Sequence, residues 1–159
     1  MNIVNTKDIM RVFATELNER METKGVTVRQ VSLATHVSRA NIYSYRYGKT
    51  FPDLYSLVMF ADYFNCSVDE LLGYRSNVEG CGVMDLAISE KEFADEFRDR
   101  LQEYMESKTC DVKELAERSG ISANSIDMYL SVHRLVPRTV DFIRICSALE
   151  CTPSELLGY

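Results

Sequence analysis

Residues 27–45 carry the sequence TVRQVSLATHVSRANIYSY, which contains two short helical patterns separated by a turn. Thr27 and Gln30 have the spacing of a capping box, in which two side chains bond to free backbone amides at a helix start. This spacing predicts a helix that ends near Thr35. Ser38 is a favourable N-cap residue, and it predicts the start of a second helix directly after the turn.

Three further helices are predicted around this pair. Ile9, Phe13, Leu17 and Met21 recur every four residues, which gives one helix an apolar face. The five predicted helices span residues 7–23, 27–35, 38–48, 52–64 and 67–73. No segment alternates apolar and polar residues as a β-strand does, so the sequence predicts an all-α fold.

The whole pattern occurs twice. The sequence LLGY of residues 71–74 recurs at residues 156–159. When the chain is compared with itself at a shift of 84 positions, ten further residues of the first copy align with identical residues of the second. If one inserted residue is allowed near Val132, seven identical residues align after it, including LLGY. The whole comparison covers about 60 positions. Most of the shared residues are apolar or helix-capping, the types that determine a fold, so we expect a tandem repeat of two five-helix domains.

We place the first domain at residues 1–75 and the second at residues 89–159, joined by a linker over residues 76–88. The linker contains Gly80-Cys81-Gly82 and has no helical period before Ser89. Domains of about 70 residues bury modest cores, so we expect each copy to be stabilised by contact with the other copy or with a second chain.

The charge is divided unevenly between the copies. The chain carries a formal net charge of −6, which ordinarily argues against a nucleic-acid partner. Residues 1–75, however, hold nine Lys and Arg against eight Asp and Glu, whereas residues 76–159 hold nine against sixteen. The acidity therefore belongs to the second copy.

The cysteines indicate neither disulfides nor a metal site. Cys66 and Cys151 occupy the same repeat position, where a small apolar residue would be buried, and Cys110 and Cys146 replace core residues of the other copy. Only Cys81 lies in the linker. We expect reduced core thiols, as in a cytoplasmic protein, and no metal or other cofactor.

An enzyme and a membrane protein are both disfavoured. The sequence has no Gly-rich phosphate loop and no Cys/His or Ser/His arrangement at a useful spacing. His36 aligns with Gly120, so we interpret it as a turn residue rather than a catalytic one. Neither a signal segment nor an apolar run of membrane-spanning length appears, which predicts a soluble, cytoplasmic protein.

Two helices joined by a tight turn, second and third of five, resemble the helix-turn-helix of the phage-repressor Cro/CI/Xre family. The similarity covers residues 27–52 and 65–72, and it recurs at residues 121–137 and 149–157. The resemblance implies a lambda-repressor-like fold and a sequence-specific, DNA-binding regulator of transcription such as a repressor. It also implies a homodimer on double-stranded DNA, because family members usually pair across two half-sites.

The resemblance further implies which residues contact DNA. The family's base-contacting places fall on Arg39, Ala40, Asn41 and Ser44, and its phosphate-contacting places fall on Thr27, Ser38, Tyr47 and Lys49. Arg29 is a further phosphate candidate, and Tyr43 and Arg46 are further exposed positions of the third helix. Arg can form bidentate hydrogen bonds with guanine and Asn with adenine, so Arg39 and Asn41 suit base recognition.

Several positions depart from the family pattern. The family usually has Gln where this chain has Val28 and Val112, and Glu where it has Arg46 and Leu130. The exposed positions of the second copy's third helix are Ala123, Asn124, Ser125, Asp127, Met128 and Ser131, with no cation among them. Asp127 would face phosphates with the wrong sign of charge.

We therefore expect the second copy to bind protein, by dimerising the chain, by packing on the first copy or by holding another protein. Candidate apolar contact residues are Met128, Val140 and the Leu135-Val136 loop. Since only one copy looks competent for DNA, two chains are needed to present two DNA-binding helices. The alternative function is a protein-binding regulator, antitoxin-like or a phage-encoded inhibitor, that keeps the repressor fold without binding operators.

Overall fold

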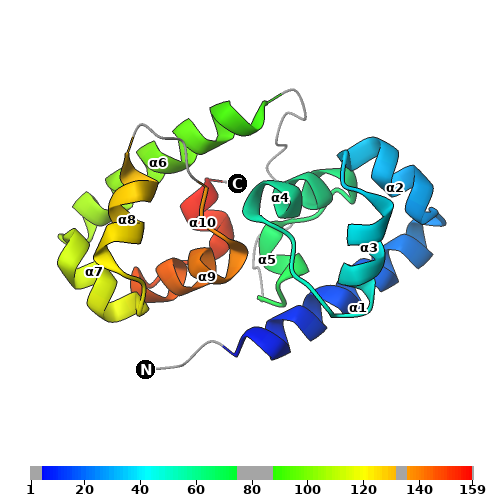
Figure 1. The fold of residues 1–159 in the computed structure, drawn as a ribbon, viewed down its shortest axis with the longest axis horizontal. Coiled ribbons are helices and arrows are strands. Elements are labelled where there is room, and N and C mark those ends of the chain that lie inside the picture. The colour runs from blue at the N-terminus through cyan, green and yellow to red at the C-terminus, as the bar shows by residue number, and fades with distance from the viewer. Residues whose placement is uncertain (1–4, 75–87, 132–135, 159) are drawn as a thin grey trace. The chain divides into compact units, whose positions relative to one another are not determined.

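The computed structural model describes residues 5–74, 88–131 and 136–158, and these ranges contain ten helices and no strand. The chain divides into two compact units, Met1–Met84 and Asp85–Tyr159. No helix among the described residues is both long and apolar enough to cross a membrane. The predicted all-α fold of two tandem five-helix domains is confirmed (Figure 1).

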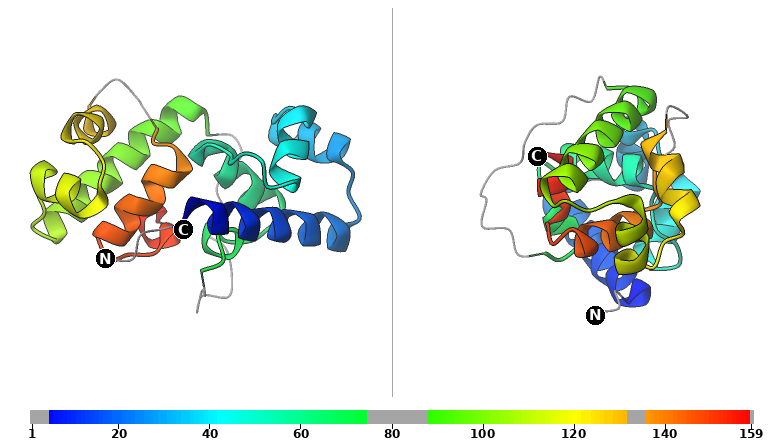
Figure 2. Two further views of the ribbon diagram at one scale, coloured as in Figure 1. Left: turned by 60° about the horizontal axis from the view of Figure 1, so that its bottom comes forward. Right: turned by 90° about the vertical axis from the view of Figure 1, so that its left-hand side faces the viewer.

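Unit 1 contains the first five helices. They are α1 (Thr6–Lys24), α2 (Val28–Thr35), α3 (Arg39–Arg46), α4 (Leu54–Tyr63) and α5 (Val68–Leu71). The first helix packs against α3 and α5, α2 packs against α3 and α4, and α4 packs against α5. Figure 2 (left) shows α3 lying alongside the dark-blue α1.

The core of unit 1 is built on aromatic side chains from three helices. Phe13 on α1, Tyr45 on α3 and Phe60 on α4 have ring centroids 6.1 to 6.2 Å apart in every pairing. Phe51 stacks on Phe13 at 5.6 Å. Aromatic rings bury large areas and prefer such tilted or offset contacts, so this cluster fixes α3 against α1 and α4.

Local caps determine where these helices begin and end. Thr27 and Ser67 form the predicted capping boxes, and Ser38 accepts a hydrogen bond from the Asn41 amide. Gly25 ends α1 in the left-handed conformation, with φ of 66°, which a residue without Cβ adopts at little cost. The third helix ends at Arg46, two residues before the predicted Gly48.

Unit 2 repeats this architecture. Its helices are α6 (Glu90–Ser107), α7 (Val112–Ser119), α8 (Ala123–Leu130), α9 (Thr139–Ala148) and α10 (Pro153–Leu157). The first of them packs against α8 and α10, α7 against α8 and α9, and α9 against α10, as the equivalent helices do in unit 1. Phe97 and Phe142 meet in its core at 6.0 Å.

The fourth helices of the two units begin differently. Asp53 caps α4 by accepting a hydrogen bond from the Ser56 amide, whereas Arg138 at the start of α9 makes no such side-chain bond. Unit 2 instead buries Asp141 in the first turn of α9, where it accepts a hydrogen bond of 2.9 Å from the Tyr129 hydroxyl. Burial and this bond raise the pKa of Tyr129 to about 12, so the phenol stays protonated and keeps donating.

The cysteines lie where core positions were expected. Cys66, Cys110 and Cys146 are buried, Cys151 is half-buried, and none of these four forms a disulfide. Cys81 lies outside the described residues.

Candidate nucleic-acid interface

The turn between α2 and α3 is held by hydroxyl side chains. Ser32 donates a 2.7 Å hydrogen bond to the Val37 carbonyl, and Thr35 donates one of 2.7 Å to the Val31 carbonyl. His36 takes the left-handed conformation, with φ of 60°, which its counterpart Gly120 also takes at 73°. The interpretation of His36 as a turn residue is therefore confirmed.

Most candidate DNA contacts project from the helix-turn-helix into solvent. Tyr43 and Tyr47 have exposed fractions of 47% and 73%, large values for aromatic side chains. The other exposed candidates are Thr27, Arg29, Ser38, Arg39, Ala40, Asn41 and Lys49. The structure thus brings the predicted residues of α2, α3 and the following turn onto exposed positions of one motif.

Two predicted site residues differ from expectation. Ser44 and Arg46 were expected to be exposed, but both are half-buried. Thr50 donates a hydrogen bond of 2.8 Å to the Ser44 hydroxyl. Arg46 is drawn back toward α1, because its Nε donates a 2.6 Å hydrogen bond to the Asn18 amide oxygen.

The Asn18–Arg46 contact is reciprocal. The Asn18 side-chain nitrogen donates a 3.0 Å hydrogen bond to the Arg46 carbonyl, one of the last carbonyls of α3, which lack intrahelical partners. One amide side chain on α1 therefore holds both the backbone and the guanidinium at the end of α3. Sequence analysis missed Asn18, because a contact 28 residues apart leaves no local spacing signal.

The exposed cations of the motif have no carboxylate partner among the residues that the structure describes. In the described part of the chain, Arg29, Arg39 and Lys49 form no ion pair with a carboxylate, and the Lys49 ammonium lies 5.9 Å from the centre of the Tyr47 ring. A cation without an internal partner is available to a phosphate or to a base edge.

The helix starts add partial positive charge. Thr27 and Ser38 satisfy the amides of Gln30 and Asn41 at 3.2 Å each. The first two amides of α2 and of α3 have no intrahelical acceptor, and at a helix start they favour an anion. Both helices of the motif contain eight residues, so the dipole acts over two full turns.

The equivalent face of unit 2 has different chemistry. The exposed residues of α8 are Ala123, Asn124, Asp127 and Met128, with Met128 at 38%, and Ser125 is half-buried. None of them is a cation. Arg98, Arg118 and Arg138 in this unit each pair with a carboxylate of the same unit. The two units therefore share a framework but not a surface.

A metal centre finds no support in the described ranges, where no three His, Cys, Asp or Glu side chains gather in a group able to hold an ion.

Replacing Asn18 with Ala should loosen the end of α3. Two hydrogen bonds are lost, each worth about 1 kcal/mol, so the amides of residues 45–47 should exchange with solvent roughly tenfold faster or more. Native-state hydrogen exchange measures this. Gln102→Ala, at the aligned position of α6, is the matched control and should leave α8 protection unchanged. Equal protection of residues 45–47 in Asn18→Ala and the parent chain would contradict the role given to Asn18.

The comparison with protein families agrees with this geometry. A family model described as a Cro/C1-type HTH DNA-binding domain matches residues 16–76 and again residues 100–159. Comparison with curated proteins and with solved structures gave no match. The matched segments begin within α1 and within α6, and they cover the four helices that follow each of them, including α2–α3 and α7–α8. The chain therefore belongs to the Cro/C1-type helix-turn-helix DNA-binding family, with two copies of the domain in tandem.

Proposed function

We propose that this protein is a sequence-specific transcriptional regulator of the Cro/CI/Xre type whose first copy binds operator DNA in the cytoplasm. In this proposal α3 enters the major groove, and residues 1–75 act as the DNA-binding domain. Residues 89–159 act as a protein-contact domain, and residues 76–88 join the two.

The asymmetry between α3 and α8 carries the proposal. The aligned helices have the same N-cap residue, Ser, and the same inward-facing residues, Ile42 and Tyr45 in α3 and Ile126 and Tyr129 in α8. Outside, α3 presents Arg39 and Asn41, side chains whose hydrogen-bonding groups match guanine and adenine edges. Divergence confined to the outer face indicates that the two faces serve different partners.

The surrounding residues suit the DNA backbone. Thr27 and Ser38 stand at helix starts whose amides attract phosphate, while Arg29, Tyr47 and Lys49 supply charge and a phenol at the edges of the motif. Such contacts position the protein without recognising sequence. Arg46 differs from these residues, since its Nε is already bonded to Asn18, and we assign it to orienting α3.

We further propose that the working species is a homodimer joined through unit 2. A single helix-turn-helix makes too few contacts for tight specific binding, and two-fold related half-sites call for two equivalent DNA-binding helices. Met128 is exposed on α8, and Val136 and Val140 are half-buried nearby in sequence; Leu135 lies outside the described residues. These apolar residues favour a protein over a phosphate backbone as the partner of unit 2.

Arg39→Ala is expected to cost about 1–3 kcal/mol of binding free energy on the preferred operator and to relax specificity at one base pair. The physical reason is the loss of a bidentate contact to a base edge. The measurement is affinity on the site selected from a random DNA pool and on its single-base variants. Asn124→Ala in α8 is the control and should change neither quantity. An unchanged base preference in Arg39→Ala would rule out the assignment. A parent chain that selects no DNA would instead favour the protein-binding regulator.

Light scattering tests the dimer. The full chain should give twice the 18.2 kDa mass of one chain, and Met128→Lys should shift it toward the single-chain mass, because a charge would be buried in the contact. Leu33→Lys is the control, since Leu33 is 67% exposed on α2, and it should leave the dimer intact. A single-chain mass for the parent protein both free and on DNA would exclude the dimer.

A further inference from the structure

A groove runs along unit 1 between α1 and the end of α3. It has a volume of about 550 Å³ and is lined on the α1 side by residues spaced three to four apart. The lining residues from α1 include Lys7, Arg11 and Asn18, and the other wall is formed by residues 46–49. This spacing places the α1 residues on one helical face.

Every charged residue that lines the groove is a cation. Lys7, Arg11, Arg46 and Lys49 line it, and its lining contains no Asp or Glu. Within the part of the chain that the structure describes, none of these four cations forms an ion pair. Like charges kept close together without carboxylates repel one another, which an anionic ligand would relieve.

Two local contacts hold the wall formed by residues 46–49. Asn18 holds Arg46 by the reciprocal bonds described above, so the guanidinium stays at the α1 wall. The Lys49 amide donates a 3.0 Å hydrogen bond to the Ser44 carbonyl, and Gly48 turns the chain with φ of 67°. The chain after α3 is therefore fixed where Lys49 faces the groove.

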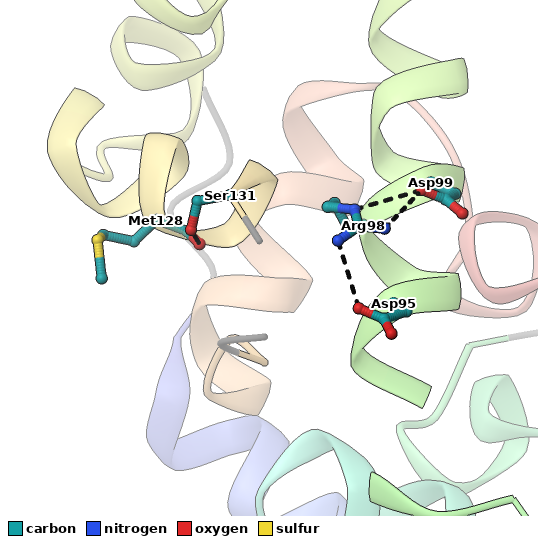
Figure 3. A network of polar contacts seen from close by, with 5 residues as sticks. All are labelled: Asp95, Arg98, Asp99, Met128 and Ser131. Carbon is teal, nitrogen blue, oxygen red and sulfur yellow. Dashed lines mark hydrogen bonds and ion pairs between the residues drawn. The ribbon is translucent and has the colours of Figure 1, made fainter. Parts of the chain in front are cut away.

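The repeat supplies an internal comparison at the same place. Arg11, Ala14 and Thr15 of α1 align with Asp95, Arg98 and Asp99 of α6. Figure 3 shows Arg98 projecting from α6 on the side of Ser131, with ion pairs of 3.3 Å to both Asp95 and Asp99. Unit 2 thus neutralises its cation at this place, whereas the four groove cations of unit 1 form no ion pair among the described residues.

We propose that this groove binds the phosphodiester backbone of the operator beyond the phosphates contacted by α2 and α3, with Lys7 and Arg11 as its outer contacts. The inference rests on the proposed function, because the groove adjoins the Tyr47–Lys49 turn already assigned to the backbone. The flexible Lys ammonium binds phosphate as a point charge, and the planar Arg guanidinium can donate two parallel hydrogen bonds to it. The groove lengthens the footprint of unit 1 without adding sequence recognition.

The test compares the full-length double variant K7Q/R11Q with the control K91Q/K108Q, which removes the same charge from exposed positions of unit 2. Operator affinity is measured over a salt series on the preferred duplex and on a scrambled one. Each neutralised phosphate contributes about 0.9 to the slope of log K against log salt, so K7Q/R11Q should flatten it by about two units. Both duplexes should weaken alike, on the order of tenfold at 0.15 M salt, and the control should match the parent chain.

Each other outcome has a separate meaning. A parent chain that binds neither duplex overturns the proposed function itself. A parent chain that binds, with an unchanged slope in K7Q/R11Q, overturns the groove inference alone. Calorimetric titration with inorganic pyrophosphate distinguishes a small free anion. If the parent chain binds pyrophosphate and K7Q/R11Q does not, while the salt dependence of DNA binding is the same in both, the groove belongs to such an anion and the inference is overturned.

Discussion

The contact of Phe13 with Tyr45 and Phe60 is the constraint on which unit 1 depends. The third helix has eight residues, fewer than an isolated helix needs to persist in water. It is helical because Ile42 and Tyr45 are buried against α1 and α4, and because Ser38 and Asn18 satisfy its two ends. The residues proposed to contact DNA are therefore positioned by side chains that do not touch DNA.

The same constraint explains how one domain can occur twice with two surfaces. Positions 42 and 45 keep identical residues at 126 and 129, because a change of volume in a close-packed core is costly. Exposed substitutions away from caps usually alter stability by less than about 0.5 kcal/mol. Exposed Arg39 aligns with exposed Ala123, and such a difference leaves the fold intact while it changes the chemistry of the surface.

Sequence predicted most of the fold because the signals were local. Capping boxes such as Thr27–Gln30 determine helix starts within four residues, and the turn at His36 followed from its alignment with a glycine. The list of site residues followed from the same motif, and the structure shows most of them exposed. Whether they bind DNA stays a prediction.

The parts that sequence did not predict are contacts between distant segments. Asn18 lies 28 residues before Arg46, and an exposed-looking arginine at a helix end gives no sign that its Nε will be bonded. The way in which α9 begins could not be predicted from the sequence either, because Asp141 in its first turn is bonded to a buried tyrosine of α8. The basic groove arises only when α1 and the Tyr47–Lys49 turn are placed side by side.

The division of labour between the units can be measured in one titration. An isotopically labelled full-length chain, with its backbone amide resonances assigned, receives the duplex selected from a random pool. We predict that amide resonances of α2, α3 and residues 47–49 shift when the duplex is added, and that those of α7 and the first turns of α8 do not. Shifts in α8 as large as those in α3 would contradict it.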